Sequence, residues 1–295
     1  MAAGIGNWER FCQSPFTLHD VCAAASYWKR DLQDIERPWL CWNVDDEWCL
    51  VQQQMVLEVG WTPLVGFDPR VGMPPLVPGA RAIDFNAPFG FSTMYPHFPL
   101  EFAFAFAERL AFWHSDLLVP LERMKAYARR FEAISDEEII ATEPALPWRN
   151  RIIGPRIRRA WELLGCVSKG GSLSNFEKGC GWWMCFYLHP NCQGHDERRK
   201  RMREYWDHGT GVLYWRDHCD GNLSMIPEAE LDPGHFTRIR RRDTYKVTGH
   251  DDWRRDLSSE LSANFSLAKA CEAMGLKKIY EQAMTHRRSR PEMLT

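Results

Sequence analysis

Apolar and polar stretches alternate through the first 145 residues in a way that predicts strands separated by helices. Residues 38–44 and 62–67 are short apolar runs typical of buried strands. Between them, residues 47–59 have the spacing of a helix, which Gly60 would end. A strand, a helix and a second strand in this order form a βαβ unit, whose two strands run parallel.

The same alternation continues further along the chain. Residues 81–85 form the next predicted strand, after a loop rich in Pro and Gly over residues 69–79. Residues 98–109 fit the period of a strand and that of a helix, and we expect a helix because a parallel strand after them needs a crossover. A helix over residues 121–134 and a strand over residues 138–142 complete the series.

Residues 110–120 are the most informative part of this half, because they combine a buried strand, a single acid and the start of a helix. The apolar run from Leu110 suits a strand covered on both faces, and Pro120 suits the first turn of a helix. Asp116 then lies in the crevice beyond the carboxyl end of the strand, where open α/β sheets bind ligands. The alternative is that Asp116 caps the helix that follows it.

The second half of the chain has a different pattern. Beyond residues 143–150 the apolar runs are short, the glycines frequent and the charges dense. The net charge of −2 conceals this difference: residues 1–145 contain 11 Lys and Arg against 20 Asp and Glu, a net −9, whereas residues 146–295 contain 26 against 19, a net +7. Since there is no low-complexity linker and no internal repeat, we expect one continuous domain with an irregular, basic second half.

The C-terminal region has a helical pattern again. Residues 251–286 are expected to form two or three helices. Asn264 would cap one of them and Gly275 would end it.

Composition argues against several classes of protein. Residues 1–11 lack an apolar core and contain Glu9 and Arg10, so we expect no signal peptide and a cytoplasmic protein. The most hydrophobic window, residues 98–119, is interrupted by charged residues and is not expected to span a membrane. The 10 Cys are therefore expected to be reduced thiols. The glycines match neither a P-loop nor a dinucleotide fingerprint, which argues against ATP hydrolysis and NAD chemistry.

The order of these features resembles the nucleotide-sugar glycosyltransferases of the GT-A type over about residues 38–240. Residues 39–45 resemble the first strand of that family and its nucleotide-facing end, and residues 83–86 resemble the strand that approaches the base or ribose. His114-Ser115-Asp116 resembles the metal motif, which usually reads Asp-any-Asp, with His114 where the first Asp is expected. The resemblance implies an α/β fold in which helices flank a mostly parallel sheet.

The resemblance also implies an activity, and it implies different binding roles for different parts of the chain. The nucleotide-sugar donor would bind about residues 38–145, the acceptor would bind residues 146–285, and residues 286–295 would be a tail. The expected reaction transfers a sugar from this donor to an acceptor that the sequence does not identify, whether a glycan, a protein or a nucleic acid. The basic second half would suit an anionic acceptor.

Candidate donor and metal residues lie where the predicted strands end. A hard cation, Mn²⁺ or Mg²⁺, would neutralise the departing diphosphate, and Asp116 is the best-placed ligand for it. His114 is on the same face of the strand, so it would share the metal or orient Asp116, unless it is a structural histidine. The resemblance further implies a late ligand, for which His235 is the candidate and His208 the alternative. The candidate donor-binding residues are Trp42, Asn43, Asp45, Asp84 and His114.

Residues 169–183 form a glycine-rich segment that offers catalytic and acceptor-binding candidates, and we expect it to be a loop. Glu177 would act as the general base that deprotonates the acceptor hydroxyl. Trp182 and Trp183 would stack on the acceptor. The alternative is a structural turn with both Trp side chains in the core.

Two other interpretations remain open. One is a structural zinc site, although the spacing lacks the close pairs typical of zinc ligands. Its candidate ligands are Cys180, Cys185, His189, Cys192, His195, His208, His218 and Cys219. The other is a different class of function, a non-catalytic nucleic-acid- or protein-binding module whose basic runs, such as residues 198–203 and 238–242, form the working surface.

Overall fold

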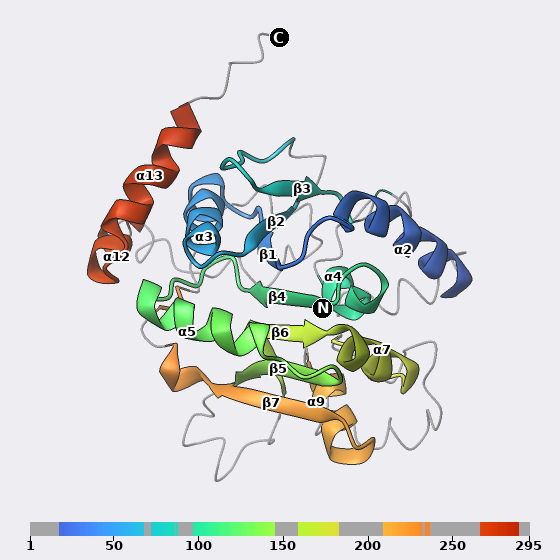
Figure 1. Ribbon diagram of the computed structural model, residues 1–295. Coiled ribbons are helices and arrows are strands. Elements are labelled where there is room, and N and C mark those ends of the chain that lie inside the picture. Colours follow the sequence, from blue (N-terminus) through green and yellow to red (C-terminus); the bar gives the residue numbers. More distant parts are fainter. Residues whose placement is uncertain are drawn as a thin grey trace, which may run out of the picture. The chain divides into compact units, whose positions relative to one another are not determined.

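The computed structural model describes residues 18–67, 72–85, 87, 97–144, 159–182, 209–231, 234–236 and 266–288. In these residues the strands form a seven-stranded mixed sheet in the order β3-β2-β1-β4-β6-β5-β7 (Figure 1). The strands are β1 (Pro38–Trp42), β2 (Thr62–Gly66), β3 (Arg81–Ile83), β4 (Arg109–Trp113), β5 (Glu138–Glu143), β6 (Trp161–Ser168) and β7 (Asn222–Pro227). The pairs β1–β2, β2–β3 and β5–β7 are parallel, and β5–β6 is antiparallel. The predicted α/β class with a mostly parallel sheet is confirmed.

The chain divides into two compact units whose segments interleave along the sequence. The β1 unit takes residues 37–96, 113–132 and 231–295, and the β5 unit takes residues 1–36, 97–112 and 133–230. The helices of the β1 unit are α3 (Asp46–Glu58), α5 (Leu121–Glu132), α12 (Leu267–Ala273) and α13 (Lys277–Arg288). Those of the β5 unit are α2 (Leu18–Leu32), α4 (Phe98–Glu101), η3 (Ala103–Ala105), α7 (Lys169–Glu177), α9 (Thr210–His218) and η5 (Glu228–Glu230). No helix among the described residues is long and apolar enough to cross a membrane.

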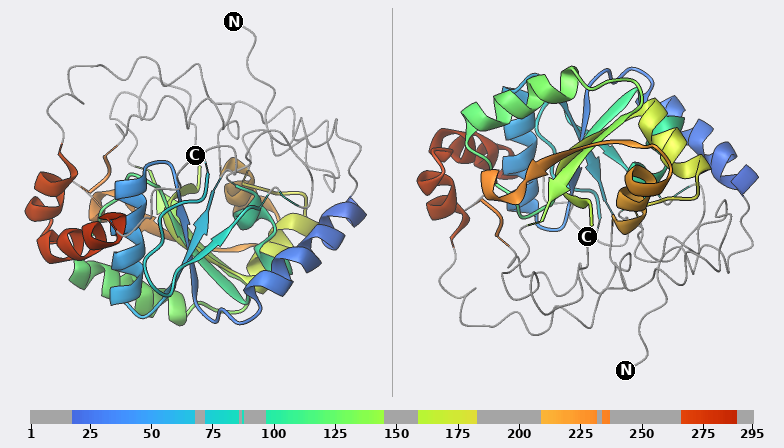
Figure 2. Two further views of the ribbon diagram at one scale, coloured as in Figure 1. Left: turned by 90° about the horizontal axis from the view of Figure 1, so that it is seen from above. Right: turned by 90° about the horizontal axis from the view of Figure 1, so that it is seen from below.

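The core of the β1 unit is built around Trp39 of β1, whose side chain is fully buried. The centroid of its ring lies 5.4 Å from that of Trp61 and 5.3 Å from that of Phe131 on α5. Helix α3 covers the strands of this unit, and α13 packs along α3, as Figure 2 shows. Large aromatic side chains buried in this way contribute strongly to the hydrophobic stabilisation of a core.

The core of the β5 unit explains why the helix predicted over residues 98–109 is only partly formed. The chain leaves helical geometry at Phe102 (φ −114°, ψ 21°), between α4 and η3. The ring of Phe102 is fully buried, and its centroid lies 6.1 Å from that of Trp28 and 5.3 Å from that of Phe176. Packing of this ring from several sides overrides the local helical period, and β4 already begins at Arg109.

The expectation of an irregular second half is wrong for the residues described there. Residues 169–177 form α7 rather than part of a loop, and Ser168 caps this helix by accepting a hydrogen bond from the N–H of Gly171. A Cβ at Gly170 would lie 2.4 Å from the carbonyl oxygen of Asp136, and one at Gly171 would lie 2.6 Å from that of Glu138. These glycines therefore allow α7 to pack closely beside the start of β5, which is a different use from loop flexibility.

The helical C-terminal region is confirmed in part. Its described helices, α12 and α13, are separated by a turn in which Gly275 has a φ of +71°, so this residue ends α12 as predicted. The cap of α12 is Ser266, whose hydroxyl oxygen accepts a hydrogen bond from the N–H of Lys269. The predicted cap, Asn264, lies outside the described residues.

Candidate metal centre

Strand β4 ends at the buried Trp113, and the polar residues His114, Ser115 and Asp116 follow it directly. The chain turns there, since the N–H of Leu117 donates to the carbonyl oxygen of His114 over 3.2 Å. Helix α5 begins only at Leu121, so Asp116 is not in a capping position, and the capping alternative is wrong. The carboxylate of Asp116 is 15% exposed and is placed beyond the carboxyl end of the strand, as predicted.

A short segment from much later in the sequence, residues 234–236, lies beside this turn. The N–H of Leu118 donates to the oxygen of Gly234 over 2.9 Å, and the N–H of Phe236 donates to the oxygen of Asp116 over 2.9 Å. Leu117 and His235 form an antiparallel bridge between these two bonds. The pairing brings the side chain of His235 to that of Asp116, although the two residues are far apart in the sequence.

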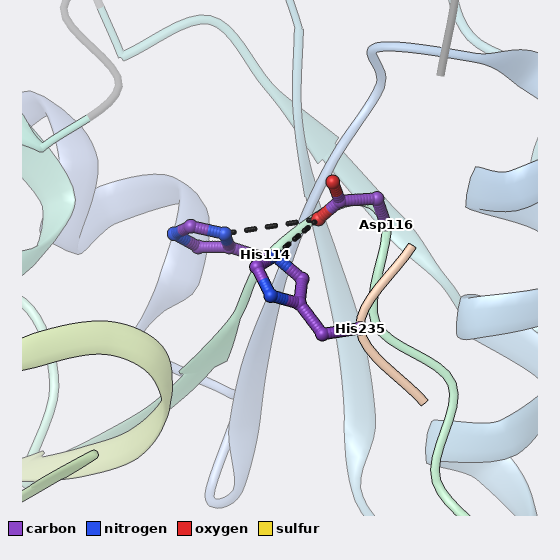
Figure 3. Close-up of side chains that lie close together, drawn as sticks. All are labelled: His114, Asp116 and His235. Atoms are coloured by element: carbon purple, nitrogen blue, oxygen red, sulfur yellow. Dashed lines mark ion pairs between the residues drawn. The ribbon is translucent and has the colours of Figure 1, made fainter. Parts of the chain in front are cut away.

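The resulting group joins two imidazoles and one carboxylate (Figure 3). Oδ1 of Asp116 lies 3.7 Å from Nδ1 of His114 and 3.5 Å from Nε2 of His235, and the ligand atoms of all three lie within 4.8 Å of one another. Two ligand atoms that share one metal ion, each about 2.1 Å from it, are roughly 3 to 3.5 Å apart. His114, Asp116 and His235 could therefore hold a metal ion.

The donor set of this group leaves room for a further ligand. The three ligands found among the described residues do not complete a tetrahedral or octahedral shell, so further ligands, such as water or an oxygen atom of a bound molecule, would occupy the other positions. The side chains of His114 and His235 are 28% and 13% exposed, so the group is neither sealed in the core nor fully open to solvent.

Three of the other candidate donor residues, Trp42, Asn43 and Asp84, lie at the end of a strand of the same unit or directly after one. Asn43 comes directly after β1 and is 8% exposed; its N–H donates to the oxygen of Gly66, and its side-chain Oδ1 has no hydrogen-bond partner within the described structure. Trp42 lies against Gly66, where a Cβ would be 2.4 Å from the Trp42 ring. Asp84 is half-buried directly after β3.

Asp45, a candidate donor-binding residue, has a structural use as a helix cap. It is the N-cap of α3, and its Oδ1 accepts hydrogen bonds from the N–H groups of Glu47 and Trp48 over 2.9 and 3.3 Å. An Asp directly before a helix whose first turn is acidic is a recognisable capping signal, since its side-chain oxygen accepts the first N–H groups and carboxylates stabilise the first turn. A donor-binding role for Asp45 remains a prediction.

The predicted catalytic and acceptor residues belong to the β5 unit. Glu177 is the last residue of α7 and is exposed. Trp182 is 1% exposed, and its ring packs edge-on against Phe112 with the centroids 5.2 Å apart. These surroundings favour the core interpretation of Trp182, whereas Trp183 lies outside the described residues.

Part of the alternative zinc cluster is described as well. The sulfur atoms of Cys180 and Cys219 lie 4.0 Å apart, and His218 is next to Cys219. In the described part of the chain these residues belong to no group of three ligands with metal-binding spacing. The remaining candidates, Cys185, His189, Cys192, His195 and His208, lie outside the described residues.

Comparisons with known proteins do not identify a function for this chain. No protein-family model, no curated protein and no solved structure matches the chain. The structure defines the class as an α/β protein with a mixed, mostly parallel seven-stranded sheet and a His-Asp-His group that could hold a metal ion.

Proposed function

We propose that this protein is a metal-dependent glycosyltransferase of GT-A type, which transfers a sugar from a nucleotide-sugar donor to an acceptor. The observation that carries the proposal is the group of His114, Asp116 and His235 directly after β4. Two of these residues, His114 and Asp116, follow the carboxyl end of a buried strand, which is where open α/β sheets bind ligands.

In this proposal each group of residues has one task. His114, Asp116 and His235 would hold a divalent cation, Mn²⁺ or Mg²⁺, which supplies positive charge to the diphosphate leaving group. Asn43 offers a buried Oδ1 without a partner in the described structure, and a donor N–H or O–H would satisfy it. Glu177 would accept the proton of the acceptor hydroxyl.

Asp116→Asn tests the metal role, because an amide keeps the shape of the carboxylate and removes the charge that a divalent cation needs. Calorimetric titration of Mn²⁺, with and without a nucleoside diphosphate, should show binding to the wild type and loss of metal-dependent nucleotide binding in the variant. Glu122→Gln is a matched control, since Glu122 is an exposed carboxylate of the same unit and its side chain is 86% exposed. Unchanged affinity in Asp116→Asn would refute the metal role.

The activity itself is tested by screening nucleotide sugars for a thermal shift with and without Mn²⁺, followed by donor-hydrolysis assays. The proposal requires at least one donor that stabilises the protein only when Mn²⁺ is present. If the protein does not bind Mn²⁺ and no nucleotide sugar raises its melting temperature, it is not a glycosyltransferase of this kind. Nucleic-acid binding that weakens steeply with salt would then support the alternative of a nucleic-acid-binding module.

A further inference from the structure

Gln52 is a fully buried polar residue in the middle of α3. Its Nε2 donates to the carbonyl oxygen of His114 over 2.7 Å and to that of Leu117 over 3.0 Å. A buried amide is costly unless it makes hydrogen bonds, and both hydrogens of this amide are used on the segment that follows β4. The side chain therefore links α3 to the metal-group segment, defined as residues 114–118.

The two carbonyl groups that Gln52 contacts lie on either side of Asp116. On its other side the metal-group segment is held by main-chain hydrogen bonds, from Phe236 to Asp116 and from Leu118 to Gly234. The segment is thus fixed from two directions, by α3 through one side chain and by residues 234–236 through their backbone. A loop without these restraints would let the carboxylate and the two rings move relative to one another.

We propose that Gln52 is a positioning residue for the metal group: it sets the backbone of the segment that carries His114 and Asp116. The inference rests on the proposed metal-binding function of that group. Metal ligands must be held within about 0.5 Å of productive geometry, and outer residues that hold them typically change metal affinity by 10- to 100-fold when mutated. Gln52 acts through the main chain of His114, without contact to the ion itself.

The neighbouring residue provides a matched control. Gln53 is also fully buried in α3, and it likewise links the helix to a backbone segment. Its Nε2 donates to the oxygen of Pro75 over 3.0 Å, and its Oε1 accepts from the N–H of Val77 over 3.0 Å. Gln52 and Gln53 thus share helix, burial and number of backbone partners, and they hold different segments. Gln53 also contacts the sulfur of Cys49 over 3.3 Å, whereas Oε1 of Gln52 has no partner within the described structure.

The experiment compares Gln52→Met and Gln53→Met in the full chain, with Mn²⁺ as the probe. Methionine keeps the length of the side chain and removes the amide. Calorimetry and electron paramagnetic resonance of bound Mn²⁺ report the affinity and the symmetry of the site, and thermal melts report stability. We expect Gln52→Met to bind Mn²⁺ about 10- to 100-fold more weakly with an altered spectrum, and Gln53→Met to lose comparable stability with unchanged Mn²⁺ affinity and spectrum.

Equal Mn²⁺ affinity in the wild type and Gln52→Met would overturn the positioning role, and so would equal losses in both variants. If Gln52→Met does not fold, Gln52→Asn decides: it keeps an amide but is too short for both carbonyls, so it should give an intermediate loss of affinity, and wild-type affinity would overturn the inference. Failure of the wild type to bind Mn²⁺ would refute the proposed function itself, and the inference with it. A specific loss in Gln52→Met alone supports both.

Discussion

The backbone of Gly234 lies so close to Leu118 that a Cβ at Gly234 would be 1.9 Å from the carbonyl oxygen of Leu118. The same two residues share a hydrogen bond, because the N–H of Leu118 donates to the oxygen of Gly234 over 2.9 Å. The next residue is His235, whose approach to Asp116 depends on this pairing. The absence of a side chain at position 234 is thus a condition for the metal group as described.

Gly234→Ala should therefore displace His235 and weaken Mn²⁺ binding. We expect the affinity to fall by a factor of about ten or more, as is typical when a residue that holds a metal ligand in place is mutated. Mn²⁺ calorimetry measures the effect. Gly79→Ala is the control. Gly79 belongs to the same unit and has a φ of +92°, so this substitution strains the backbone at a position outside the metal group. A variant that binds Mn²⁺ as the wild type does would show that His235 does not need this close approach.

Glu177→Gln tests the proposed general base. General-base catalysis contributes about 10²-fold or more to rate, so the variant should lose this factor in turnover while nucleotide affinity stays nearly unchanged. Steady-state kinetics with a donor identified by the thermal-shift screen measures both quantities. Lys178→Gln, at the next exposed position, controls for a general effect on the end of α7. Full turnover in Glu177→Gln would leave this residue without a catalytic role.

Trp182→Ala distinguishes a core residue from a stacking platform. Because the side chain is 1% exposed and packs against Phe112, its removal should destabilise the protein by about 3 to 5 kcal/mol. Urea unfolding measures the free energy of unfolding, and Leu173→Ala, at an exposed apolar position of α7, should cost much less. A stable Trp182→Ala protein with a raised requirement for acceptor would contradict the core interpretation.

Buried thiols should make the protein less stable at alkaline pH. Burial raises the pKa of Cys49 from its ordinary value of 9.0 to about 12, and burial also raises the pKa of Cys41 and of Cys166. Above pH 9 the unfolded chain loses thiol protons that the folded protein keeps, so the free energy of unfolding falls as the pH rises toward 12. The fall is at most about 1.4 kcal/mol per pH unit for each thiol.

Urea unfolding between pH 7.5 and 10.5 measures this slope. Other groups titrate in the same range, so the informative comparison is with Cys49→Ala, in which the slope should be shallower. Identical slopes in the two proteins would mean that Cys49 ionises in the folded state as readily as in the unfolded chain.

Much of the fold is determined locally by the sequence. The apolar runs that form β1, β2, β4 and β5 and the periods that form α3 and α5 each lie within one short segment, so their positions could be predicted within a few residues. The place of Asp116 after a buried strand follows from the same local signal. Burial of one strand or one helix face requires a pattern that a window of about ten residues already contains.

Tertiary structure decided what depends on residues far apart in the chain. Gly170 and Gly171 indicated a loop, yet they belong to α7. Their small size allows this helix to lie against the carbonyl groups of Asp136 and Glu138 at the start of β5. The pairing that brings His235 to Asp116 and the hydrogen bonds from Gln52 to the metal-group segment are likewise contacts between distant segments. Hydrophobic periodicity contains no signal for such contacts, since it records which face of an element is buried and not the partner against which it packs.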